Sequence, residues 1–131
     1  MKYMLSIYGD ASEWDSATPE EGAQLMAAYD ALDRELQEAG AFVAGEALQR
    51  PETATTVRVR DGERLLTDGP FAETREQMGG FYLLECANLD EAIGWAAKIP
   101  NAADGAVEVR PIMEFDEPAA STADDDAAAR A

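Results

Sequence analysis

The segment LTDGPFAETREQMGGFYLLE, residues 66–85, gathers side chains capable of chemistry between two predicted strands. The proline of DGPF fixes its own φ and biases Gly69 away from the helical region, while Gly69 can take a positive φ, so a rigid corner is expected. Such a corner would present Asp68 and Glu73 as candidate acid and base groups and Phe71 as a candidate apolar wall. The alternative is a purely structural turn whose phenylalanine fills the core.

Other candidates lie on neighbouring predicted elements. The pair Gly79-Gly80 would let the chain pass close to another group, because neither residue has a Cβ. Tyr8, at the end of the first predicted strand, is expected as a second apolar wall of the same site. Asp10 and Trp14 follow in a loop, where they form either the mouth of a pocket or a solvated connection with one anchoring aromatic.

Three charged residues alternate with apolar neighbours on predicted strands. Arg58, Arg110 and Glu46 stand in TVRVR, VEVRP and VAGEAL, so they are expected on the sheet face opposite the helices. There they either pair with one another or line a pocket, in which an arginine binds the anionic group of a small acidic molecule.

The composition excludes several kinds of catalytic site. The 131-residue chain has no histidine and a single cysteine, Cys86, which rules out Ser-His and Cys-His nucleophiles, an intramolecular disulfide and a cysteine zinc cluster. No phosphate-binding glycine motif, dinucleotide fingerprint or metal-ligand spacing occurs, so no metal and no cofactor are expected. Carboxylates alone could hold magnesium or calcium, but no motif organises them.

The charge of the chain limits its partners. The net charge is −17, and residues 116–131, with five acids and one arginine, account for −4 of it, so residues 1–115 keep −13. Because binding to phosphates requires clustered lysine and arginine, direct contact with nucleic acid or an anionic membrane is not expected. No apolar run reaches the roughly 20 residues of a membrane span, and no signal peptide is evident, so the expected location is the cytoplasm.

Hydrophobic periodicity predicts one domain over residues 1–115. Strands are expected at 2–8, 41–48, 53–60, 80–87 and 106–115, and a tight Asp61-Gly62 turn leads from the third into a further strand at 64–68. Helices are expected between the Thr18 capping box and Gly40, and at 88–99. Residues 116–131 contain no large apolar side chain and are expected to form an acidic disordered tail.

The order of these elements predicts an α+β fold, a split βαβ arrangement with both helices on one face of a mainly antiparallel sheet. The other face would then carry too much apolar surface to remain in water. We therefore expect a homodimer that packs sheet against sheet through Met4, Tyr8, Phe42, Leu48, Tyr82, Leu84 and Ile112.

Four segments resemble the YCII-related family, in the branch named for its DGPF motif. They are MKYMLSIYGD at the start, GEAL at 45–48, TATTVRVRDG at 53–62 and, above all, DGPFAETREQMGGFYLLE at 68–85. The likeness runs from residue 1 to about 115. It implies a ferredoxin-like fold that dimerises into an α/β barrel, and it implies no known reaction.

The resemblance also suggests where acid–base groups would stand. In the better-studied YCII branch, a histidine on the first helix and an aspartate near its end are a proposed acid–base pair. Counted back from Gly40, these places fall on Tyr29 and Glu38. A phenol titrates near pH 10, so Tyr29 suits a proton donor or an orienting hydroxyl better than a neutral-pH base. Its alternative role is core packing, since it shares an apolar stripe with Leu25.

Two functions remain open at this point. The first is a small cofactor-independent enzyme or ligand-binding barrel, by analogy with dimeric α/β barrels that act as lyases, isomerases and oxygenases without a metal. The second is a non-catalytic regulatory partner of an extracytoplasmic-function sigma factor. DGPF-type members are often considered alongside such factors, and an acidic body suits a basic protein surface.

Overall fold

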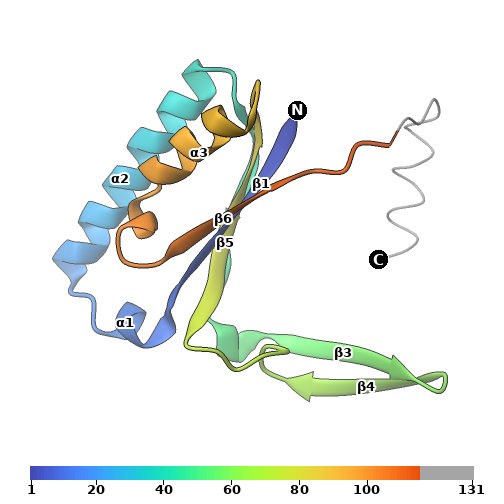
Figure 1. Ribbon diagram of the computed structural model, residues 1–131. Helices are drawn as coiled ribbons and strands as arrows, with labels where there is room; N and C mark the ends of the chain where they lie inside the picture. Colours follow the sequence, from blue (N-terminus) through green and yellow to red (C-terminus); the bar gives the residue numbers. More distant parts are fainter. Residues whose placement is uncertain (116–131) are drawn as a thin grey trace.

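The computed structural model describes residues 1–115 as a four-stranded antiparallel sheet with helices on one face and a separate hairpin (Figure 1). The sheet order is β2-β5-β1-β6, formed by Phe42–Ala47, Glu76–Glu85, Lys2–Asp10 and Ala106–Pro111. Helices α2 (Pro19–Glu38) and α3 (Leu89–Lys98) cover the same face. With the hairpin set aside, the chain reads β-α-β-β-α-β, so the predicted split βαβ, ferredoxin-like fold is confirmed.

The core lies between the central strands and the two helices. In β1, Tyr3, Leu5 and Ile7 alternate toward the helices, and the register pairs Tyr3 with Leu84 and Leu5 with Tyr82 of β5. The helices contribute small or branched side chains that fill the remaining space, namely Leu32, Leu36, Ala92 and Ala96. One apolar face of each element is thereby buried in a single cluster.

Helix α2 packs on the sheet along only part of its length. The predicted capping box starts it: the Thr18 hydroxyl accepts from the Glu21 amide at 3.1 Å, and the Glu21 carboxylate accepts from the Thr18 amide at 2.9 Å. Its buried residues, Leu32 and Leu36, both lie in the C-terminal half. Near the start, Leu25 is 40% and Met26 65% exposed. The N-terminal half of α2 therefore stands off the sheet.

Among residues 1–115, strands β3 (Thr55–Arg60) and β4 (Glu63–Asp68) pair only with each other. Asp61 and Gly62 join them with φ values of 51° and 78°, the conformation that a two-residue hairpin turn favours, so the predicted turn is confirmed. The expected place of Arg58 on the main sheet is wrong. A strand pair has the same local pattern whether it joins a larger sheet or projects from it, and here it projects.

Three residues predicted on the uncovered sheet face instead lie toward the helices. Tyr82 and Leu84 are buried, and Phe42 packs on them, its ring edge-on to Tyr82 at a centroid distance of 6.3 Å. In GFYLLE both alternations are apolar, so periodicity does not decide which side faces inward. The structure gives the uncovered face to Phe81 and Leu83, which pair with Ser6 and Met4.

The remaining elements are short. A five-residue helix, α1 (Ala11–Asp15), follows β1, and single 3₁₀ turns span η1 (Pro51–Thr53) and η2 (Pro100–Ala102). The last strand ends at Pro111, four residues earlier than expected. The predicted disordered tail, residues 116–131, lies outside the described residues. No helix in the part of the chain that the structure describes is long and apolar enough to cross a bilayer.

Gly69→Ala should lower the free energy of unfolding by about 1–3 kcal/mol, because Gly69 has a φ of 97° that strains any residue with a Cβ. Urea denaturation measures the effect. Gly22→Ala is the matched control: Gly22 lies inside α2 with open space where a methyl group would stand, and alanine there should be neutral or add up to about 1 kcal/mol. Equal stabilities of the two variants would contradict the strained corner.

Candidate functional site

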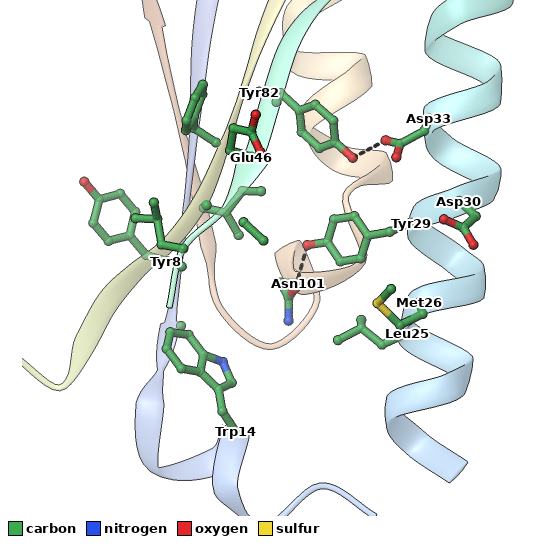
Figure 2. A pocket seen from close by; sticks show the side chains of 18 of the residues that line it. Tyr8, Trp14, Leu25, Met26, Tyr29, Asp30, Asp33, Glu46, Tyr82 and Asn101 are labelled. Atoms are coloured by element: carbon green, nitrogen blue, oxygen red, sulfur yellow. Dashed lines mark hydrogen bonds between the residues drawn. The ribbon is translucent and has the colours of Figure 1, made fainter. Parts of the chain in front are cut away.

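A cleft of about 510 Å³ opens between the N-terminal half of α2 and the end of the sheet. Figure 2 shows Leu25, Met26 and Tyr29 on its helix side, Tyr82 on its strand side, and Trp14 at one end. The volume lies in the range of small-molecule sites, which are concave, mostly apolar and carry a few convergent polar groups. The cleft exists because this part of α2 does not pack on the sheet.

Glycines shape the sheet side of the cleft. A Cβ on Gly45 would lie 2.8 Å from the Tyr82 ring, so only glycine leaves room for that ring. A Cβ on Gly79 would lie 3.2 Å from the Trp14 ring, and one on Gly80 would lie 2.8 Å from the Glu46 carbonyl oxygen. The expectation that Gly79-Gly80 permits a close approach is confirmed: Gly79 lies under the indole, and Gly80 lies against the backbone of β2.

Two tyrosine hydroxyls cross the gap between the helix layer and the sheet (Figure 2). Tyr82 of β5 donates to the Asp33 carboxylate of α2 at 2.5 Å, and Tyr29 of α2 donates to the side-chain oxygen of Asn101 at 2.6 Å. Desolvation raises the pKa of Tyr29 to about 12 and outweighs the opposing effect of the Asn101 backbone. Desolvation, then the bond to Asp33, raises the pKa of Tyr82. Both phenols are therefore neutral at physiological pH.

The charges around the cleft are mostly negative. Asp33 lies inside it, while Asp30 lines it from an exposed position on α2. The guanidinium of Arg50 also lines the cleft, but it is paired with Asp15 at 2.9 Å and with Glu52 at 2.8 Å. Since this arginine is already bound by two carboxylates, the field in the cleft favours neutral or positively charged groups.

The DGPF corner lies apart from this cleft, in a shallow hollow. Asp68 and Glu73 line that hollow together with Asp10 and Arg75, whose ion pair is loose at 3.7 Å. Asp10 caps α1, and its pKa is lowered by the bonds that its carboxylate accepts from the Ser12 hydroxyl and amide. Phe71 is 79% exposed, so it does not fill the core.

The carboxylate of Asp68 makes no hydrogen bond or ion pair within residues 1–115. The corner is instead closed by the backbone, where the Gly69 amide donates to the Ala54 carbonyl at 2.7 Å. Asp68 therefore neither caps its own loop nor shares the main cleft with Tyr8. The prediction that Asp68 and Tyr8 line the same site is wrong, because the hairpin carries the DGPF corner away from the sheet.

The residues predicted as one constellation are thus distributed over several places. Tyr29, Tyr8 and Glu46 border the main cleft, although the Tyr8 ring points away from α2 (Figure 2). Asp10, Asp68 and Glu73 border the hollow. Arg58 lies on the hairpin, and Arg110 is exposed on β6, 3.1 Å from Glu108. The described residues contain no cluster of metal-ligand side chains.

Sequence reasoning missed Asp33, Tyr82 and Asn101 as site residues. Asp33 had a signal, because Leu25, Tyr29 and Asp33 recur every four residues on one face of α2. Asn101 had none. It follows α3, 72 residues from Tyr29, and only the folded chain brings the two together.

Fold and site together define an α+β protein with a ligand-sized cleft between helix and sheet. The family model for the YCII-related domain matches residues 1–116. An uncharacterised protein of Rhizobium meliloti (strain 1021) is 40% identical over 117 residues, which cover 88% of this chain and 94% of that protein. The chain therefore belongs to the YCII-related family.

Tyr29→Phe should remove a tyrosine that ionises only near pH 12, and absorbance at high pH measures the loss. The folded-state pKa exceeds the ordinary value near 10, so the neutral phenol contributes stability below pH 10 that is lost as the pH rises from 10 toward 12. The fall in unfolding free energy over that window should be smaller in the variant. A wild-type Tyr29 that titrates near 10 would contradict its burial against Asn101.

Proposed function

We propose that the protein binds a small, largely apolar molecule in the cleft between α2 and the sheet. The cleft itself carries the proposal: its aromatic and aliphatic walls, Trp14, Phe42, Leu25 and Met26, surround a few fixed polar atoms. Leu25 and Met26 are exposed to water. Their burial under a ligand would be favourable, because it removes apolar surface from water.

The ligand should carry a neutral or positively charged polar group. The sequence predicts an acidic molecule held by Arg58 or Arg110, but neither arginine lines the cleft. The available acceptors are the carboxylates of Asp30 and Asp33 and the oxygen of Asn101. An ammonium or hydroxyl group can donate to these atoms, whereas a carboxylate would be repelled by Asp30.

The same groups permit proton transfer without a metal or cofactor. Asp30 is the candidate proton acceptor, since the sequence has no histidine and the phenols of Tyr29 and Tyr82 remain protonated. The phenols would act as orienting groups whose hydroxyl oxygens accept from the substrate. The proposal of catalysis therefore depends on the proposal of ligand binding, and evidence against binding would also contradict catalysis.

We further propose a homodimer formed through the uncovered sheet face. Met4, Phe81 and Leu83 lie on that face and are only half-covered. The face is flanked by charged side chains of Glu108 and Arg110, as at the rim of an interface. Two such faces packed together would form the α/β barrel that the family resemblance implies.

The alternative is a non-catalytic regulatory partner that acts with an extracytoplasmic-function sigma factor in the cytoplasm. The exposed Phe71 supports it, because a rigid corner that presents an aromatic side chain suits a protein contact. The net charge of −17 also suits a basic partner surface. Co-purification with such a factor through Phe71, lost in Phe71→Ala while cleft ligands still bind, would favour this alternative.

Three compounds of matched size test the cleft: 2-phenylethylamine, 2-phenylethanol and phenylacetate. Isothermal titration should give the amine the tightest binding and phenylacetate a dissociation constant at least about tenfold higher, because of the cleft carboxylates. Asp30→Asn should remove most of the preference for the amine over the alcohol.

Glu38→Gln is the matched control, since it removes the same charge from the same helix outside the cleft. It should leave all three affinities unchanged. Absence of binding by all three at millimolar concentration would contradict the ligand site. Phenylacetate binding as tightly as the amine would contradict the assigned charge.

A further inference from the structure

The β3–β4 hairpin presents an apolar face to water. The register places Val57 opposite Leu66 and Val59 opposite Arg64, so these four side chains share one face. Val57 is 56%, Val59 59% and Leu66 66% exposed. An isolated two-stranded hairpin is marginally stable at best, and an exposed apolar face on a projecting hairpin indicates a contact surface.

The hairpin carries three arginines beside three acids, Asp61, Glu63 and Asp68, so its net charge is zero, and Arg64 is the arginine that lies on the apolar face. Arg58, Arg60 and Arg64 are three of the ten lysine and arginine residues, and within residues 1–115 none of them forms an ion pair. The rest of the described chain is strongly acidic. Helix α2 alone carries six acidic residues against one arginine. The acidic surface of α2 therefore complements Arg64 on the apolar face of the hairpin.

The direction of the hairpin suits a second copy. Figure 1 shows it leaving the end of the sheet toward the side opposite α2 and α3, the side of the uncovered sheet face. Each strand has six residues, so the hairpin reaches about 20 Å, whereas two sheets packed face to face are only about 10 Å apart. If a second copy packs on the uncovered face, the hairpin tip of the first copy would reach the level of the second copy's helices.

We propose that the hairpin is a dimer arm that grips the second copy of the chain. Its apolar face packs against the side of the partner, and Arg64, nearer the turn on that same face, pairs with the partner's acidic helix layer. In a two-fold dimer both arms make this contact, so each interaction counts twice. The inference rests on the homodimer proposed above, and it adds a surface that the sheet face does not contain.

Leu66→Asp tests the arm, and Leu65→Asp is its matched control. The two leucines are neighbours in β4 but lie on opposite faces, so each variant gains the same charge on the same strand. Sedimentation velocity from 0.1 to 100 µM measures the dimer dissociation constant, and circular dichroism confirms that both variants fold. Leu66→Asp should weaken the dimer by about a hundredfold, and Leu65→Asp by no more than about threefold.

Arg64→Gln supplies the charge test, with Arg60→Gln on the other face as its control. Loss of Arg64 should weaken the dimer several-fold and flatten its dependence on salt, because an ion pair between copies is screened. A dimer equally affected by the two leucine substitutions would overturn the arm while leaving the sheet-face dimer intact. A wild-type protein that is monomeric up to 100 µM would overturn both.

Discussion

The hydrogen bond between Tyr82 and Asp33 fixes the relation between the sheet and α2. It joins strand β5 to the C-terminal half of the helix at 2.5 Å, beside the packed residues Leu32 and Leu36. A bond from a phenol to a carboxylate contributes about 1.5–3 kcal/mol. Toward the start of α2 the packing stops, and Tyr29 reaches Asn101 instead of the sheet. The cleft is the space that remains where α2 no longer packs on the sheet and is connected to the rest of the protein by the Tyr29–Asn101 hydrogen bond.

The two faces of the sheet have different surroundings. The helix face holds the core at one end and the cleft at the other, with acidic groups at its opening. The uncovered face and the projecting hairpin lie on the opposite side (Figure 1). The proposed ligand cleft and the proposed sheet-face interface therefore lie on opposite faces of the sheet. The exposed DGPF corner joins the hairpin to the sheet, and its turn combines the positive φ of Gly69 with the bond from the Gly69 amide to the Ala54 carbonyl.

Local features were predictable because they depend on a few adjacent residues. The Thr18–Glu21 capping box, the Asp61-Gly62 turn and the positive φ of Gly69 all follow from residue type at fixed spacing. The inward face of β5 was not predictable, since Phe81 and Leu83 are as apolar as Tyr82 and Leu84. Nor was the cleft, because Tyr29 and Asn101 meet only through the tertiary fold. These pairings depend on geometry that no short pattern encodes.

The central claim is that the cleft beside α2 receives a ligand, and methionine methyl NMR tests it most directly. Of the five methionines, Met26 lines the cleft, whereas Met113 is 73% exposed beyond the last strand and outside the cleft. Addition of 2-phenylethylamine should shift the Met26 methyl resonance in a saturable manner and leave that of Met113 unchanged. An unchanged Met26 resonance, or equal shifts at both methyl groups, would contradict the claim.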